Sequence, residues 1–266
     1  MTNVNHRSLA AVVFAVTASV SAPAVQAQES DWCRDERRDD RRYCELQEFT
    51  LPASGRLSVD ARPNGGISVR SWNGDEVRVV AKIVARADDA ASARDLVADV
   101  SIERSGTIRA DGPRSRRDES WWVSYRIDVP ASYDLDLEST NGGLSIEGVS
   151  GDIRLETTNG GLVLDGVGGD VQAHTTNGGV EVTLSGSRWE GRGLEAITTN
   201  GGIELGIPAA YSARLETGTR NGGFEIDFPI TVSGRIGRTI STELGSGGAP
   251  ITVRTTNGGV TVRRTG

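Results

Sequence analysis

Cys33 and Cys44 are the only cysteines in the 266-residue chain and the residues best able to form a covalent cross-link. In an oxidising compartment an isolated pair of this kind forms a disulfide. A straight helix between the two would hold their Cα atoms about 16 Å apart, too far for a disulfide. We therefore expect the charged segment between them to turn back on itself. The alternative, two thiolates that bind a metal ion, lacks the second Cys or His pair of a structural zinc site.

Candidates for catalysis are few. Only one histidine, His174, follows the first 27 residues, and we expect it on the surface. The chain has no Gly-x-Ser-x-Gly elbow, His-Glu-x-x-His helix or phosphate-binding loop. We predict a protein with no catalytic residues and no cofactor. The alternative is a polysaccharide-cleaving β-helix enzyme, because carboxylates, which act in pairs in glycoside cleavage, are plentiful.

A metal site has one weak candidate. The segment from Asp165 to Asp170 is similar to the calcium-binding repeats of β-rolls, but it occurs once and out of order. We predict a tight glycine turn there and no metal site.

Three aromatic residues, Trp121, Trp122 and Tyr125, lie on one predicted strand. Side chains alternate along a strand, so Trp122 faces away from the other two. One face should pack under the core, and the other is a possible binding surface, because exposed Trp and Tyr suit contact with a sugar or a protein.

The elements that position these residues follow from an internal repeat. Asn-Gly-Gly recurs six times in the second half of the chain, with spacings of 18, 18, 23, 21 and 36 residues. Its asparagines are Asn141, Asn159, Asn177, Asn200, Asn221 and Asn257. We interpret the last spacing as two units of 18, with Gly245 to Gly248 as a degenerate turn in place of a missing Asn-Gly-Gly.

Apolar residues keep fixed positions in each unit, three and five residues after the Asn and four and six before it. The residues at the position three after each Asn are Leu144, Leu162, Val180, Ile203, Phe224 and Val260. Each unit is therefore two short strands with one apolar face, which becomes buried only when units stack about 4.8 Å apart. The predicted fold is all-β, a β-solenoid or β-helix-like stack.

The repeats also predict their corners. Asn and Gly tolerate left-handed backbone, which we expect in each Gly-Gly pair. Stacked Asn side chains are expected to form a hydrogen-bonded ladder. A Ser/Thr column two residues before each Asn is expected to satisfy backbone groups nearby.

An outward-facing acidic column follows from stacking in sequence order. Glu181, Glu204 and Glu225 all stand four residues after the Asn, and they should lie about 5 Å apart. Such close like charges repel unless arginines, such as Arg214 or Arg220, compensate. The alternative is that the column binds a cation or a basic partner.

The chain divides into three parts. Residues 1–27, with Arg7, an apolar run and Val25-Gln26-Ala27, are typical of a secretory signal peptide. Residues 28–50 are the charged segment with the cysteine pair. Residues 51–266 form a single repeat β domain, in which 51–130 are irregular and 131–266 carry the repeats. Asp88 and Asp89 should cap one short covering helix in the irregular part, ending near Val100.

The charge of the chain limits its partners. The formal net charge is −7, and loss of Arg7 with the signal peptide takes it to −8. An acidic chain without a basic face argues against nucleic-acid binding. No later segment reaches 18 apolar residues, so we predict no integral membrane segment after signal cleavage.

The chain resembles the bacterial putative-adhesin family. The resemblance rests on the Thr-Thr-Asn-Gly-Gly repeats, on Ile207-Pro208-Ala209-Ala210-Tyr211, and on Leu244 to Gly248 followed by Ile251 to Val262. It covers about residues 51–266. The resemblance implies a domain of unknown function with a β-helix-like repeat fold and an exported or surface-associated role, and it supplies no catalytic residues.

Together these features predict an exported, non-catalytic binding or structural protein of the cell envelope, periplasmic, surface-bound or secreted. Its partner would be an envelope glycan, a protein or a cationic peptide. An enzyme should instead show a groove with convergent acids.

Overall fold

The computed structural model describes residues 32–227 and 238–265, most of them in strands. Two helices occur in these parts, the 3-10 helix η1 (Glu36–Arg38) and α2 (Ala90–Ala98). The first seven strands are β1 (Arg42–Pro52), β2 (Arg56–Asp60), β3 (Ile67–Trp72), β4 (Glu76–Arg86), β5 (Ser101–Glu103), β6 (Thr107–Asp111) and β7 (Ser120–Pro130). The repeats contain β8 (Asp134–Ser139), β9 (Leu144–Glu147), β10 (Ser150–Thr157), β11 (Leu162–Asp165), β12 (Gly168–Asn177), β13 (Val180–Thr183), β14 (Gly193–Asn200), β15 (Ile203–Pro208), β16 (Ala213–Asn221), β17 (Phe224–Asp227), β18 (Thr239–Leu244), β19 (Pro250–Asn257) and β20 (Val260–Thr265).

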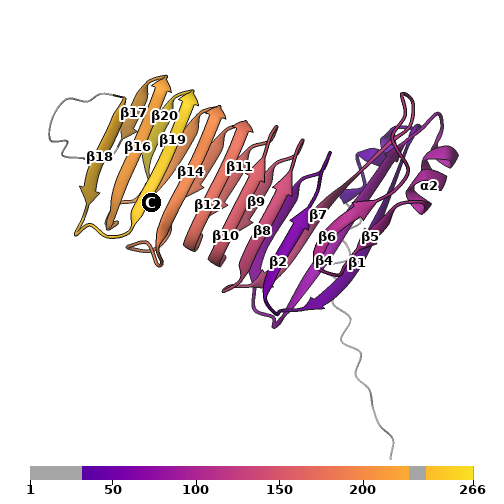
Figure 1. Ribbon diagram of the computed structural model, residues 1–266, viewed down its shortest axis with the longest axis horizontal. Helices are drawn as coiled ribbons and strands as arrows, with labels where there is room; N and C mark the ends of the chain where they lie inside the picture. The colour runs from indigo at the N-terminus through magenta and orange to yellow at the C-terminus, as the bar shows by residue number, and fades with distance from the viewer. Residues whose placement is uncertain (1–31, 228–237, 266) are drawn as a thin grey trace, which may run out of the picture.

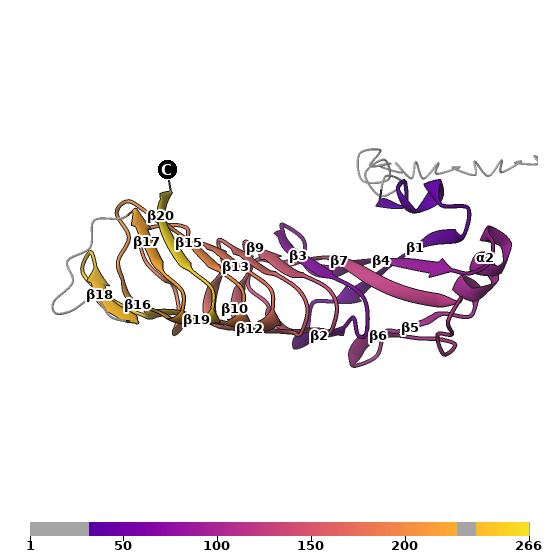
Figure 2. The same cartoon turned by 90° about the horizontal axis from the view of Figure 1, so that it is seen from above.

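The strands form two ten-stranded sheets that face each other along an elongated molecule (Figures 1 and 2). Sheet A has the order β1-β4-β7-β3-β9-β11-β13-β15-β20-β17. Sheet B has the order β18-β16-β19-β14-β12-β10-β8-β2-β6-β5. Pairing within the repeats is parallel and in register, so that Leu162 lies between Leu144 and Val180. The all-β, solenoid-like fold predicted from the repeats is confirmed.

Each layer of the stack consists of one strand of sheet B, an Asn-Gly-Gly corner and one strand of sheet A. Residues three and five after each Asn point inward, and most are almost fully buried, as Leu162 and Leu164 are. In the layer at the end of sheet A, Phe224 and Ile226 are only partly buried. Strands β2 and β3 add a layer at the N-terminal end, with Asn64-Gly65-Gly66 as its corner. The buried apolar residues of successive layers stack on one another and form a continuous narrow core.

The layers do not follow sequence order at the C-terminal end. Strand β19 pairs with both β14 and β16, and β20 pairs with both β15 and β17. The last repeat is therefore inserted between two earlier ones. The interpretation of the 36-residue spacing as two stacked units is wrong, because β18 runs antiparallel to β16 and Gly245–Gly248 only connects it to β19.

The N-terminal end departs from the repeat. Antiparallel strands β1, β4 and β7 extend sheet A, and α2 packs against β1 and β4 (Figure 2). Helix α2 is the covering helix expected from the sequence, with Asp89 capping the backbone N–H of Ser92 and Ala93 and Val97 buried. Strand β1 spans the boundary predicted between residues 50 and 51. The predicted signal peptide, residues 1–27, lies outside the described residues.

Candidate binding surfaces

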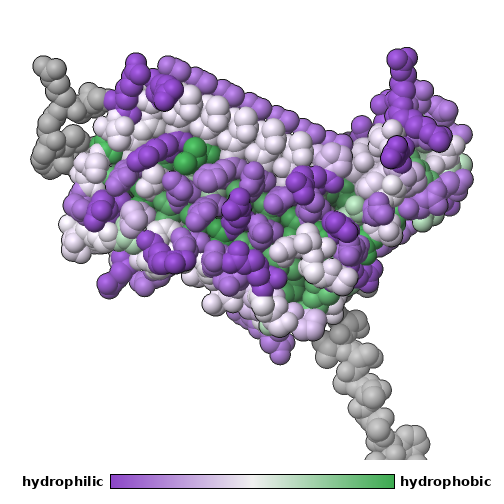
Figure 3. All heavy atoms as spheres, viewed as in Figure 1, coloured by the Kyte–Doolittle hydropathy of each residue, from purple (hydrophilic) through white to green (hydrophobic). Residues whose placement is uncertain are grey.

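A ladder of asparagine side chains runs the length of one corner of the stack. Each Nδ2 donates to the Oδ1 of the Asn in the adjoining layer, at 2.7–2.8 Å. In spatial order the ladder is Asn64, Asn141, Asn159, Asn177, Asn200, Asn257 and Asn221. The edge that includes this corner is visible as a regular row of residues along the top of Figure 3.

Beneath the ladder, buried hydroxyl groups link the layers. Each Ser or Thr two residues before an Asn donates to the carbonyl oxygen of the first corner glycine in the adjoining layer, at 2.7–2.9 Å. Thr175, for example, donates to Gly160. These bonds satisfy carbonyl groups that would otherwise be buried without partners.

The corners require glycine for a different physical reason from the one expected. None of them has a positive φ, so the predicted left-handed backbone is wrong. A Cβ on the first glycine of each pair would instead lie well under 3.0 Å from the carbonyl of the adjoining layer, as at Gly160 against Gly142. Positive φ occurs at the opposite corner, where Gly148 and Gly166 end β9 and β11. Close backbone approach therefore requires the glycine after each Asn.

Next to this corner, the outer face of sheet A contains a shallow hollow of about 540 Å³. Its floor is the second corner glycine of four consecutive layers, Gly161, Gly179, Gly202 and Gly259. Its side chains include Val163, Glu181, Glu204 and Thr261. Val163 is 41% exposed and is the only large hydrophobic residue exposed in the described parts of the chain.

The acidic column differs from the prediction. Glu181 does pair with Glu204, but Thr261 lies between Glu204 and Glu225 because β20 is inserted there. The compensating cation is Arg263, whose guanidinium contacts Glu204 and lies 3.7 Å from Glu181. Arg214 instead pairs with Glu243. The column is thus a pair of glutamates bridged by one arginine, with Glu225 apart.

The aromatic strand is not an open binding surface. Tyr125 is 1% exposed and belongs to the core, so its suggested role in binding is wrong. Burial raises the pKa of its hydroxyl above the ordinary value. Trp121 packs against the same core and donates from Nε1 to the carbonyl of Pro113. Both residues stabilise the N-terminal end and lie far along the stack from the hollow.

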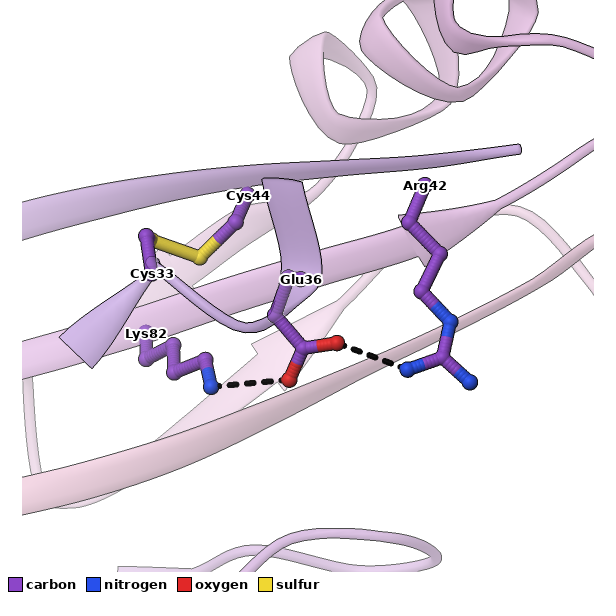
Figure 4. Close-up of a disulfide and its surroundings, with 5 residues drawn as sticks. All are labelled: Cys33, Glu36, Arg42, Cys44 and Lys82. Carbon is purple, nitrogen blue, oxygen red and sulfur yellow. Dashed lines mark hydrogen bonds and ion pairs between the residues drawn. A yellow bond between two sulfur atoms is a disulfide. The ribbon is translucent and has the colours of Figure 1, made fainter. Parts of the chain in front are cut away.

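Trp122 faces the other way, as alternation predicts, and packs against a separate cluster of Cys33, Cys44 and Val84. The two cysteines form a disulfide with a Cα–Cα distance of 5.7 Å (Figure 4). The short Cα–Cα distance shows that the segment does turn back on itself, and η1 lies between the cysteines. We call residues 32–41 the N-terminal clip.

Glu36 fastens this clip to the sheet (Figure 4). Its carboxylate accepts hydrogen bonds from Lys82 at 2.9 Å and from Arg42 at 2.7 Å. Burial raises the pKa of Glu36, but the hydrogen bonds and positive charges of Lys82 and Arg42 outweigh burial and hold the pKa below 4.5. We interpret the arrangement as structural, since Lys82 and Arg42 both bind the carboxylate of Glu36.

The remaining candidates are isolated. His174 lies on the outer face of sheet B, 3.9 Å from Glu195. Gly166 and Gly169, both with positive φ, form the turn between Asp165 and Asp170, and Asp170 pairs with Arg192. In residues 32–227 and 238–265, no group of three or more His, Cys, Asp or Glu side chains is placed to hold a metal ion. The helices found there are too short or too polar to cross a membrane.

Two features of the hollow are not evident from the sequence. The repeated Asn-Gly-Gly indicates corners, but a glycine repeated at one position also leaves an open strip. Arg263 follows Asn257 by six residues, and only the insertion of β20 places it beside Glu204.

The fold and the ladder define a two-sheet parallel β-solenoid with an irregular N-terminal end. The chain belongs to the family described as Toastrack DUF4097, whose model matches residues 63–263. No curated protein matches the chain.

Several solved structures are similar. A "putative cell adhesion protein" from Clostridium sporogenes is 10% identical, with a TM-score of 0.45, and the match covers 84% of this chain and 100% of that one. A "putative adhesin" from Bacteroides fragilis is 11% identical, with a TM-score of 0.34 and coverage of 83% and 97%. A "putative lipid binding protein" from Parabacteroides distasonis is 9% identical, with a TM-score of 0.30 and coverage of 84% and 97%. At these values the likenesses say nothing about what this chain binds.

Proposed function

We propose that this protein is an exported, adhesin-like, non-catalytic protein of the cell envelope that binds an extended envelope glycan along the outer face of sheet A. The observation that carries the proposal is the hollow beside the asparagine ladder, which crosses four layers. A hollow of this shape suits an elongated ligand that runs along the stack, because the same corner glycine recurs in each of the four layers.

The lining of the hollow suits a ligand rich in hydroxyl groups. Glu181 and Glu204 provide carboxylate oxygens, which accept hydrogen bonds from hydroxyl groups. Thr261 provides a hydroxyl, and Val163 provides an apolar surface for the face of a sugar ring. The glycine floor allows the ligand to approach the backbone closely.

The same residues do not favour the enzyme alternative. Glycoside cleavage requires a carboxyl that keeps its proton, which usually comes from an apolar enclosure. Glu181 and Glu204 lie on an open face and share the guanidinium of Arg263. We therefore propose binding without turnover.

The disulfide supports an extracytoplasmic location, because the Cys33–Cys44 bond needs an oxidising compartment to persist. Placement at the cell surface, in the periplasm or in the medium is part of the proposal.

The test is a binding measurement with a substitution that fills the hollow. Thr261→Trp places a large ring over the glycine floor, and Thr252→Trp makes the same change in the same repeat on the opposite sheet. Both proteins and the wild type would be titrated with polysaccharide purified from the envelope and with neutral oligosaccharides. We expect Thr261→Trp to weaken binding at least tenfold and Thr252→Trp to leave it unchanged.

The proposal is wrong if no envelope polysaccharide binds, or if both variants bind as the wild type does. A cationic peptide that binds in place of the glycan would assign the surface to the other partner class. Release of reducing sugar during incubation would support the alternative function, a polysaccharide-cleaving enzyme.

A further inference from the structure

A second hollow lies on the outer face of sheet B, near the C-terminal end of the stack. Its volume is about 480 Å³, within the range of roughly 300–1,000 Å³ typical of ligand pockets. It is lined by strands β14, β16 and β19 and the start of β18, and it includes Ile197, Gly218, Arg220, Arg238 and Arg254. It is separate from the hollow on sheet A.

Gly218 is the reason for the opening. It pairs with Arg254 of β19 on one side and with Thr239 of β18 on the other, at a position whose neighbours face outward. A side chain here would stand between those neighbours, and its Cβ would lie 3.3 Å from the nearest atom, the carbonyl oxygen of Arg238. Glycine leaves a gap in the side-chain layer instead.

Three arginines surround this gap. Arg254 forms an ion pair with Glu216 at 3.2 Å. Arg220 and Arg238 are exposed, and neither forms an ion pair with any residue that the structure describes. The hollow therefore carries an excess of positive charge on a chain whose net charge is −7.

Arginine side chains present forked N–H groups that match the oxygens of phosphate and carboxylate. Holding two guanidinium groups beside one hollow is unfavourable, because like charges repel. An anion that enters the gap removes this repulsion. Ile197 and the threonine side chains add apolar and hydroxyl contacts at the rim.

We propose that this hollow binds an oxyanion, a phosphate or carboxylate group carried on a unit about the size of a sugar. Arg220 and Arg238 bind the anion, Arg254 closes the third side, and Gly218 provides the space. The site is independent of the glycan-binding surface, because it lies on the other sheet.

The experiment measures binding of three probes: inorganic phosphate, glucose 6-phosphate, and phosphatidylcholine vesicles with and without phosphatidylglycerol. The test variant is Arg220→Gln with Arg238→Gln. Loss of each charge-assisted hydrogen bond should weaken binding about tenfold. The matched control is Arg114→Gln with Arg117→Gln, two exposed arginines in the loop between β6 and β7 that cause the same loss of charge at the other end of the stack.

A second variant keeps the charge and removes the space. Gly218→Val retains all three arginines, and Gly218 has no positive φ that would strain the new residue. Valine also has a higher strand propensity than glycine, so the variant should fold. It should weaken binding at least tenfold, which a purely electrostatic attraction would not predict.

Binding that is lost in both test variants and kept in the control supports the site. Dependence on phosphatidylglycerol alone assigns the anion to a lipid headgroup, and binding of glucose 6-phosphate in solution assigns it to a soluble or polymer-borne sugar. The proposal is overturned if none of the three probes binds the wild type, or if the arginine variant and its control weaken binding equally.

Discussion

The side-chain amide of Asn257 donates a hydrogen bond of 2.7 Å to Asn200, although 57 positions of sequence separate the two residues. The bond shows that the last repeat is an interior layer. It lies between the β14–β15 layer and the β16–β17 layer and contacts both.

This insertion predicts an unusual effect of truncation. A chain that ends at Gly248 loses β19 and β20 and leaves β16 and β17 without their parallel neighbours, and β18 is held to the stack through β16. We expect residues 209–227 and 238–248 to become sensitive to protease while the layers before β14 stay resistant. A stack in sequence order would only become shorter. Unchanged resistance of these two segments in limited proteolysis would contradict the insertion.

The corner glycines predict a sharp difference between neighbouring positions. Gly178→Ala places a Cβ against the carbonyl of Gly160, and overpacking of this kind should lower the free energy of unfolding by about 3 kcal/mol. Gly179→Ala meets its nearest atom at 3.5 Å, an ordinary contact, and should change it by about 0.5 kcal/mol or less. Urea denaturation measures both values. Equal effects would refute close approach as the cause.

The disulfide predicts that neither cysteine is free in the exported protein. Alkylation without reductant should leave Cys33 and Cys44 unmodified, and mass spectrometry should show them linked. Replacing both with Ser should cost about 3 kcal/mol, as expected for a loop of this length. Because Trp122 packs against the pair, its fluorescence should shift toward that of exposed Trp. Two readily alkylated thiols would contradict the prediction.

The N-terminal clip should loosen in acid. The pKa of Glu36 lies below 4.5 in the folded protein, so its ionised form stabilises the clip above pH 4.5. That stabilisation is lost as the pH falls through the lowered folded-state pKa. We expect proteolysis of residues 32–41 to increase as the pH falls below about 4.5.

Glu36→Gln is the control for this acid effect. It should weaken the clip at neutral pH by about 1.5 kcal/mol and reduce the added sensitivity in acid. If the variant and the wild type show the same pH profile, another group is responsible.

The glutamates of sheet A should contribute unequally to glycan binding. Glu181→Gln with Glu204→Gln removes two carboxylates of the hollow and should weaken binding about tenfold. Glu225→Gln serves as the control, because Thr261 separates it from that pair, and binding should change less than about twofold. Equal losses would show that overall charge, not this surface, attracts the ligand.

The sequence predicts the repeat architecture well, since period, parity and corner residues all agree. Asn159 and Leu162 take their places from spacing alone. The order of the layers cannot be predicted in the same way, because Asn257 would fit any layer of the stack. Pairing of Arg263 with Glu204 depends on that order and was missed for the same reason.

The physical reason for a residue type that recurs at one position of the repeat can also be misjudged. Gly160 was predicted to need left-handed backbone, yet the structure requires it for the approach of Gly142. Both causes select glycine, so the residue type cannot distinguish them. Tyr125 shows a similar ambiguity, because an aromatic residue on an alternating strand suits either a core or a binding face.

Hydrogen exchange with and without bound envelope polysaccharide tests the central claim most directly, because it locates the ligand without any substitution. The proposal predicts slower exchange confined to four short segments that line the hollow, residues 161–163, 179–181, 202–204 and 259–261. With a polysaccharide that carries no phosphate or carboxylate group, exchange on the outer face of sheet B should stay unchanged. Protection that appears elsewhere, or no protection at saturating polysaccharide, would contradict binding at this surface.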